Sequence, residues 1–244
     1  MEKYRQKAAA MKPEGPEFGQ EGKNPLRLVQ SQPVYAGMVE SVDDSVGRIL
    51  RKLEDLGLAD NTAVFFFSDN GGLSTAEGSP TSNLPLRAGK GWVYEGGIRE
   101  PTIIKWPPAQ AGGSTCATPV ISDDFYPTIL QMAGLPPRPE QHMDGTSLVP
   151  LLMGETTWPR DTLCFHYPHY SNQGGRPGGA VRQGDWKLVE WFEDERLELY
   201  NLAEDVGEQN DLAADLPEKT QELAERLRAW RREVGAQMPE RKAR

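Results

Sequence analysis

The sequence predicts an α/β fold followed by a small antiparallel sheet and a closing helix. Apolar residues at helical spacing precede a short unbroken apolar run, Ala63 to Phe67, which is typical of a strand covered on both faces of an α/β sheet. The later third holds short apolar segments separated by polar turns, the pattern of an antiparallel meander. A last amphipathic segment, from Leu216 to Val234, predicts the helix that ends the fold.

The composition is that of a loop-rich globular protein. The chain has 244 residues, 37% of them hydrophobic and 26% charged, with Gly 25 and Pro 20. A formal net charge of −9 argues against nucleic acid as the main ligand, so an anionic ligand would need a local basic pocket. The longest apolar run is far shorter than the roughly 20 residues that cross a bilayer, and no apolar segment follows the charged N-terminus. The sequence therefore predicts neither a membrane span nor a secretory signal, and it leaves the localisation unknown.

The first 33 residues predict a short helix and a linker, because prolines and glycines recur there without an apolar period. From Tyr35 to Leu56, apolar residues recur at steps of three and four, which predicts an amphipathic helix that ends at Gly57. The strand Ala63 to Phe67 follows. It stops at a polar, glycine-containing turn, Ser68 to Gly72.

A long irregular stretch from Gly72 to Arg99 leads to a second apolar strand, Thr102 to Trp106. Loops of this length in compact domains are usually functional or disordered. Ser122 to Asp124 then predicts the capped start of a helix that runs to about Met132. Helices that alternate with apolar strands favour a partly parallel sheet with helical cover.

The meander is predicted from three segments of the later third: Ala180 to Arg182, Trp186 to Phe192 and Leu197 to Tyr200. We therefore divide the chain into residues 1–33, a helix and linker, residues 34–155, an α/β portion, and residues 156–244, the antiparallel subdomain with its helix.

Asp69 and Asn70 are the first candidate site residues, because side chains at the carboxyl end of a sheet strand face the crevice where α/β proteins bind ligands. Their oxygens suit Ca²⁺ or Mg²⁺. The alternative is an Asx turn stabilised by the two glycines that follow. The residues alone favour the turn, since Ca²⁺ takes about six to eight oxygens and two residues cannot supply them.

Lys90 lies between two glycines, which let the backbone approach a ligand closely. The segment is not a phosphate-binding P-loop, because no Ser or Thr follows the lysine. A lone loop lysine is usually a solvated charge. For the nearby pair Glu95 and Arg99 we expect a structural role, holding a turn.

His166 and His169, with Cys164 close by, form the densest histidine site. Zinc is disfavoured because a structural site needs four ligands, and a thiol hydrolase is disfavoured because no third group orients the pair. Histidine and aromatic side chains here could contact a sulfated sugar or an aryl ring. They fit ordinary packing of a loop on its own domain equally well. Spacing does not say whether Cys116 and Cys164 pair.

Three ordered motifs resemble those of the type I, formylglycine-dependent sulfatases of the alkaline phosphatase-like superfamily. They are Ser68 to Gly72, Pro85 to Gly91 and Tyr94 to Pro101. The flanking helix from Tyr35 and the segment Asp185 to Leu188 are also similar to this family, so the resemblance runs from about Val34 to the C-terminus.

The resemblance implies a sulfuric ester hydrolase with a partial alkaline phosphatase-like mixed sheet, acting on a sulfated small molecule or glycan. Asp69 and Asn70 would be Ca²⁺ ligands, and Lys90 would hold the sulfate oxygens. His166 and His169 would bind substrate. The family is often periplasmic or secreted. A phosphoesterase of the same superfamily and a non-catalytic module that binds anions or sugars are the competing interpretations.

The chain departs from the family at its nucleophile. Neither Cys116 nor Cys164 lies in the motif whose cysteine or serine becomes formylglycine, and no aspartate pair completes the metal site. The chain therefore resembles the C-terminal portion of a sulfatase, which we expect to be inactive alone. The apolar side chains of the helix from Tyr35 to Leu56 should then be exposed, and we expect self-association or a need for the N-terminal part.

Overall fold

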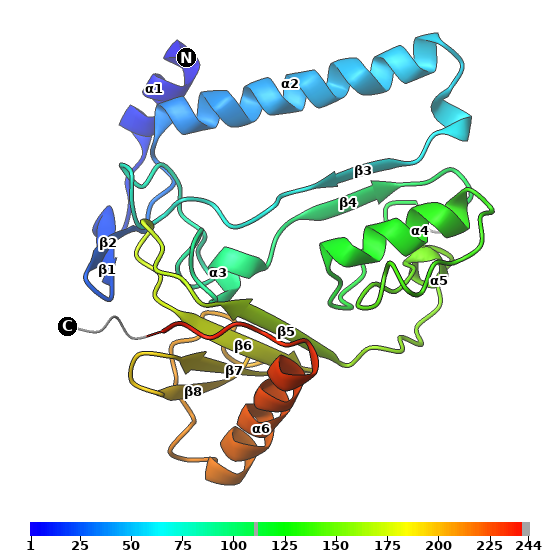
Figure 1. The fold of residues 1–244 in the computed structure, drawn as a ribbon. Helices are drawn as coiled ribbons and strands as arrows, with labels where there is room; N and C mark the ends of the chain where they lie inside the picture. The colour runs from blue at the N-terminus through cyan, green and yellow to red at the C-terminus, as the bar shows by residue number, and fades with distance from the viewer. Residues whose placement is uncertain (110–111, 241–244) are drawn as a thin grey trace. The chain divides into compact units, whose positions relative to one another are not determined.

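The computed structural model describes residues 1–109 and 112–240. In chain order (Figure 1) the elements are α1 (Glu2–Ala10), β1 (Phe18–Glu21), β2 (Asn24–Arg27), α2 (Pro33–Asp55), η1 (Ala59–Asn61), β3 (Val64–Phe67), α3 (Glu95–Ile98), β4 (Thr102–Lys105), η2 (Ser122–Asp124), α4 (Phe125–Met132), α5 (Val149–Leu152), β5 (Thr162–Tyr167), β6 (Gly178–Gln183), β7 (Trp186–Trp191), β8 (Leu197–Asn201) and α6 (Pro217–Glu233). Two compact units result. One comprises Met1–Gly47, Phe67–Pro101 and Thr162–Arg244, and the other comprises Arg48–Phe66 and Thr102–Asp161.

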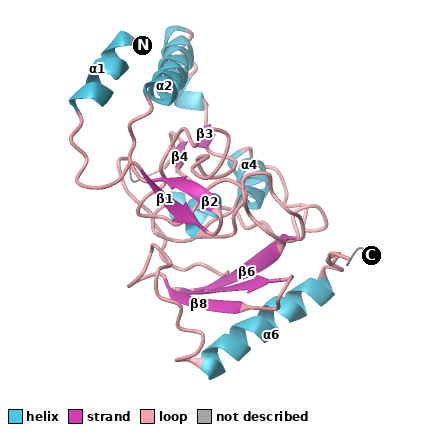
Figure 2. Cartoon of the chain, turned by 90° about the vertical axis from the view of Figure 1, so that its left-hand side faces the viewer, coloured by secondary structure: helices cyan, strands magenta, loops and turns pink. Residues whose placement is uncertain are grey.

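The predicted meander is confirmed in the first unit. Strands β6, β7 and β8 pair antiparallel in chain order, with Ala180 opposite Val189 and Leu188 opposite Leu199. Strand β5 adds a fourth strand beside β6, at the segment that the sequence suggested as a histidine site. The predicted closing helix is α6, which contacts β6, β7 and β8 (Figure 2).

This sheet is covered on both faces because its side chains alternate along each strand. One face presents Val181, Leu188 and Leu199 to Leu223 and Leu227 of α6, all of them fully buried. The opposite face presents the residues that alternate with these along each strand, and they pack against the loop that carries Lys90. That second cluster contains Ala180, Val189, Trp191 and Tyr200 of the sheet, with Ala88, Trp92, Val93 and Tyr94 of the loop. Burial of a Val side chain such as Val93 or Val189 contributes about 1.5–3 kcal/mol, so packing against the sheet stabilises the position of the loop.

The segment expected to be a linker contains a hairpin after the predicted short helix. Strands β1 and β2 pair antiparallel, and Glu21 lies opposite Asn24. The two-residue loop between them begins with Gly22 at φ 57°, the conformation that favours glycine at the first central position of a hairpin turn. The Arg27 amide donates to the Ser74 carbonyl at 2.9 Å, so a loop distant in sequence holds the hairpin in place. The sequence does not predict the hairpin, because its strands have only four residues each.

The second unit holds the paired strands β3 and β4, which run in opposite directions in Figure 1, and the helices α4 and α5. The fully buried Asp124 holds the loops of this unit together. Its carboxylate accepts the amides of Ile121 and Thr146, each at 2.8 Å, and pairs with both terminal nitrogens of Arg160 at 2.7 and 2.8 Å. The predicted helix start at Ser122 to Asp124 is present as η2 followed by α4.

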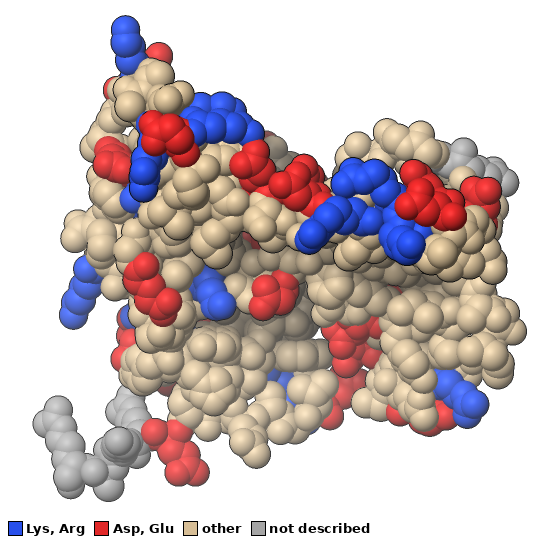
Figure 3. Space-filling model, turned by 90° about the horizontal axis from the view of Figure 1, so that it is seen from above, with Lys and Arg blue, Asp and Glu red and all other residues tan. Residues whose placement is uncertain are grey.

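The predicted strands β3 and β4 are in place, but the expectation that they are buried on both faces is wrong. Phe66 and Phe67 of β3 and Ile103 of β4 are exposed, because within the described ranges the sheet has only these two strands. Helix α2 has no buried residue, and Met38, Val42 and Ile49 along its apolar side are exposed by 52–60%. The predicted exposure of this helix is confirmed. Figure 3 shows, on one face, broad surface without Lys, Arg, Asp or Glu between groups of charged residues of both signs.

No helix of the described residues is both long enough and apolar enough to span a membrane.

Candidate active site

Three loops meet at the end of β3 through a series of backbone hydrogen bonds. The Ser68 amide donates to the Pro101 carbonyl at 3.3 Å, and the Gly71 amide donates to Gly97 at 3.1 Å. The Lys90 amide donates to the Gly72 carbonyl at 3.2 Å. These bonds place the backbone of Lys90 beside the turn that carries Asp69 and Asn70, although Lys90 follows Asn70 by 20 positions in sequence.

Glycines make this close approach possible. A Cβ atom on Gly71 would overlap the Gly96 carbonyl oxygen, and one on Gly89 would overlap the Gly72 carbonyl oxygen. Asn83 completes the packing, because its side-chain amide donates to Gly72 at 2.7 Å and to the Ala88 carbonyl at 2.8 Å. The glycines of all three sequence motifs therefore allow backbone to pack on backbone.

The candidate ligands are accessible at this junction. The side chains of Asp69 and Lys90 are exposed and that of Asn70 is partly exposed. The junction thus presents a carboxylate, an amide oxygen and an ammonium group on loops with a fixed backbone. Their roles as metal ligands and sulfate ligand stay predictions.

Glu100 is a further acidic residue at this junction, and the sequence did not single it out. Burial, and then the negative charge of Asp69, raise the pKa of Glu100 to about 7. Its Oε1 atom is buried and has no hydrogen-bond partner among the described residues. Only the pairing of Ser68 with Pro101 brings Glu100 beside Asp69, so no local pattern could have found it.

The Lys90 loop is anchored by Arg87 and two aromatic residues. Trp92 stacks on Tyr94 with ring centroids 6.0 Å apart, and the Arg87 guanidinium lies over the Tyr94 ring at 3.8 Å. Arg87 also pairs with Glu21 of the hairpin, its Nη2 atom 2.8 Å from Oε1. The Tyr94 hydroxyl donates to Glu198 at 2.7 Å, and burial, together with that carboxylate, raises the pKa of Tyr94.

Glu95 has the structural role expected for it, with a different main partner. Arg99 is 3.7 Å away, but the fully buried Lys187 ammonium lies 3.0 Å from Glu95 Oε1 and 2.8 Å from Glu208 Oε1. Glu208 in turn accepts the Glu95 backbone amide at 2.6 Å. Burial raises the pKa of Glu208 even though Lys187 opposes that rise. This ion-pair cluster of Glu95, Lys187 and Glu208 ties the start of α3 to the sheet.

The two histidines are placed apart from these groups. In β5, Phe165 packs with the cluster that holds Trp92, whereas Cys164 packs with the α6 cluster, so His166 also faces the α6 side. Its Nε2 atom lies 2.8 Å from the Gln237 carbonyl and its ring lies 5.4 Å from Phe192. His169 is exposed and contacts Tyr167 edge to face. Their role in substrate binding stays a prediction, which the position of His166 does not favour. Cys116 and Cys164 are both thiols.

Two family models match the chain. The model "Sulfatase" matches residues 2–135, and the model "N-sulphoglucosamine sulphohydrolase, C-terminal" matches residues 88–234. Together with the three motif loops, these matches show that the chain belongs to the sulfatase family.

Individual relatives agree. A sulfatase of Formosa agariphila is 40% identical over 223 residues, which cover 82% of this chain and 40% of that protein. The crystal structure of Ps i-CgsB in complex with k-i-k-neocarrahexaose matches with a TM-score of 0.71 at 29% identity, covering 82% of this chain and 43% of that one. The structure of BT4656 in complex with D-glucosamine-2-N,6-O-disulfate matches with a TM-score of 0.68 at 29% identity, covering 84% and 41%.

The chain thus spans about two fifths of the length of the relatives it matches. The matched model for the C-terminal region and the order of the motifs place it in the C-terminal portion of the family's fold.

Proposed function

We propose that this chain supplies the C-terminal part of the active site of a sulfuric ester hydrolase. Asp69 and Asn70 contribute oxygen ligands to a Ca²⁺ ion, and Lys90 binds the oxygens of the sulfate group. The observation that carries the proposal is the series of backbone bonds in which the amides of Ser68, Gly71 and Lys90 donate to the carbonyls of Pro101, Gly97 and Gly72, respectively. These bonds bring the segment with Asp69 and Asn70 and the loop with Lys90 to one junction.

The donor set fits part of a Ca²⁺ site. The Asp69 carboxylate and the Asn70 amide supply the hard oxygens that Ca²⁺ prefers, and both side chains are accessible. Two residues fall short of about six to eight ligands, so the remaining oxygens come from residues outside this chain, from substrate or from water. A bound Ca²⁺ would add positive charge where the sulfate oxygens lie.

The role of Lys90 is to stabilise negative charge on the sulfate oxygens. Its ammonium group stands on a loop whose backbone is fixed on both sides, by Gly72 and by the aromatic packing of Trp92. A donor held in place in this way can neutralise negative charge that develops on the transferring sulfuryl oxygens without first reorganising. Removal of one such donor usually lowers a rate by about a hundred-fold or more.

The nucleophile comes from outside the chain. In this family a formylglycine attacks the sulfate ester, and neither cysteine of this sequence lies in the required motif. The substrate class is a sulfated saccharide, supported by the solved relatives with bound sugars. The competing functions are a phosphoesterase and a non-catalytic module that binds anions or sugars.

Two measurements on the isolated chain test the proposal. Titration calorimetry with Ca²⁺ should give weak binding, no better than about millimolar, that Asp69→Asn abolishes. An assay with an aryl sulfate ester should show no turnover above the buffer. Micromolar Ca²⁺ affinity, binding that survives Asp69→Asn, or turnover by a preparation that mass spectrometry shows to contain only this chain would contradict it.

A further inference from the structure

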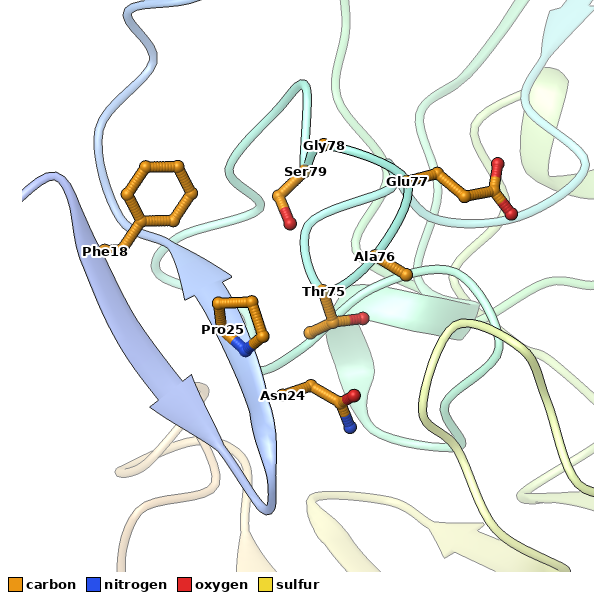
Figure 4. A pocket seen from close by; sticks show the side chains of 8 residues that line it. All are labelled: Phe18, Asn24, Pro25, Thr75, Ala76, Glu77, Gly78 and Ser79. Atoms are coloured by element: carbon orange, nitrogen blue, oxygen red, sulfur yellow. The ribbon is translucent and has the colours of Figure 1, made fainter.

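A pocket of about 490 Å³ lies between the β1–β2 hairpin and the loop Thr75–Ser79 (Figure 4). Its lining comes from three hairpin residues, Phe18, Asn24 and Pro25, and from the five consecutive residues of the loop. In Figure 4 the rings of Phe18 and Pro25 stand on one side, with Ser79, Ala76 and Thr75 facing them, while the Glu77 carboxylate points away. The pocket is separate from the junction that holds Asp69 and Asn70.

The wall formed by Phe18 is held in place by Arg27. The Arg27 guanidinium lies 4.5 Å from the centroid of the Phe18 ring, and its Nε atom donates to the Ser79 carbonyl. Glu17 pairs with the same guanidinium at 2.6 Å. Arg27 therefore connects the hairpin wall to the loop wall.

The opposite wall has an unusual backbone. Glu77, Gly78 and Ser79 have φ angles of 53°, 84° and 42°, a left-handed run in which two residues are not glycine. Such residues are uncommon and persist only where surrounding contacts hold them. Here Asn172 and Gln173 both donate to Glu77 Oε1, at 2.9 and 3.2 Å, and the Ser79 amide donates to Ala76 at 2.8 Å. These contacts hold the loop wall of the pocket in its conformation.

The lining chemistry selects a neutral sugar unit. The Phe18 and Pro25 rings offer flat apolar surface for the C–H face of a pyranose, while the Asn24 amide can hydrogen-bond its hydroxyl groups. No Lys or Arg is among the eight lining residues, and the nearby Arg27 guanidinium is already paired with Glu17, so a sulfate group would find no unpaired positive charge at the lining. The carboxylate of the one charged lining residue, Glu77, points away from the pocket, and its Oε1 atom accepts two amide donors.

The pocket is within reach of the sulfate site. Gly72, whose carbonyl accepts the Lys90 amide, precedes Thr75 of the pocket by three residues, so their Cα atoms are at most about 11 Å apart. The Thr75 hydroxyl accepts the indole N–H of Trp92 at 3.1 Å, two residues beyond Lys90. One or two sugar units cover such a span.

We propose that this pocket binds an unsulfated sugar unit of a saccharide whose neighbouring unit carries the sulfate held by Lys90. The placing of the sulfated sugar at Lys90 rests on the proposed function, whereas the affinity of the pocket for a neutral sugar does not. The proposal gives Phe18 a role in substrate selection: a saccharide of two or three units binds better than a sulfated monosaccharide.

The test uses the full chain on an array of sulfated and unsulfated mono-, di- and trisaccharides of galactose, glucose and their N-acetylamino forms. The parent should bind sulfated di- or trisaccharides at least ten-fold more tightly than sulfated monosaccharides. Phe18→Ala should remove that gain and Phe18→Tyr should keep it. Phe66→Ala, which removes an equally exposed phenylalanine of β3, is the matched control and should keep it too.

The outcomes separate the two proposals. If no saccharide binds, if chain length has no effect, or if a folded Phe18→Ala protein binds like the parent, the pocket assignment is overturned. If Lys90→Ala leaves the preference for sulfated over unsulfated saccharides unchanged while Phe18→Ala still removes the length effect, the sulfate site fails and the sugar pocket stands. Thermal melting of each variant excludes unfolding as the cause of lost binding.

Discussion

Replacing Lys187 with Met should destabilise the first unit strongly. Met is close to Lys in length but has no charge, so Lys187→Met leaves the fully buried Glu208 without its ion-pair partner. Glu95, which is 2% exposed, keeps only the longer contacts of Arg99 at 3.7 Å and Arg182 at 3.6 Å. Breaking a buried ion pair in this way usually costs about 3–5 kcal/mol. For a chain of this size each kcal/mol lowers the melting temperature by roughly 2–4 °C, so we expect a fall of roughly 6–20 °C.

The effect should also depend on pH. Burial already raises the pKa of Glu208 against the opposing charge of Lys187, and loss of that charge raises it further. A proton taken up in the folded state removes one of the two buried charges, so the variant should lose less stability at pH 5 than at pH 8.

Urea unfolding followed by circular dichroism at both pH values measures this, with Lys219→Met as the control. Lys219 lies 3.0 Å from Glu222 in an exposed pair on α6, and its loss should cost at most about 0.5 kcal/mol. If Lys187→Met costs no more than the control, or costs the same at both pH values, the ion-pair cluster does not hold the Lys90 loop.

Two further predictions concern Glu100, which lies at the candidate site, and the exposed apolar side chains of α2 and β3. Because the folded-state pKa of Glu100 is raised from an ordinary 4.5 to about 7, its stabilising contribution is complete below pH 4.5 and is lost as the pH rises through 7. Urea unfolding in EDTA should find Glu100→Gln equal to the parent at pH 4.5 and more stable by about 1 kcal/mol at pH 8, because solvent screening reduces the effect of the shift at this half-buried group. Equal stability at pH 8 would refute this. Exposed apolar side chains on α2 and β3 should make the chain self-associate in sedimentation runs at increasing concentration. A monomer at every concentration, with one cooperative thermal transition, would show instead that these faces need no partner.

Local patterns predicted the elements whose signal is periodic and long enough. The stripe of α2, the unbroken apolar run of β3 and the alternating strands of the meander all lie where their side-chain spacing indicated. The hairpin β1–β2 and strand β5 were not predicted. Four-residue strands containing Gly19 and Pro25 have little pattern of their own, and β5 carries polar residues among its apolar ones without a clear alternation.

The candidate site divides in the same way. Asp69, Asn70 and Lys90 could be singled out from their glycine-rich motifs, because the close backbone approach that requires glycine leaves a mark in the sequence. No local pattern in the sequence indicates Glu100, or Lys187 as the ion-pair partner of Glu95. Lys187 lies 92 residues from Glu95, and only the docking of the loop on β7 brings the two together.

A chimaera tests most directly whether this chain carries part of a sulfatase active site. The matched C-terminal region of the Formosa agariphila sulfatase is replaced by this chain, so that one polypeptide contains both parts. We expect the folded chimaera to hydrolyse an aryl sulfate, Lys90→Ala to lower kcat/KM by about a hundred-fold or more, and Lys12→Ala, a change at an exposed lysine of the N-terminal segment, to leave it unchanged. A folded chimaera without activity, or one in which Lys90→Ala is as active as the parent, would contradict the account.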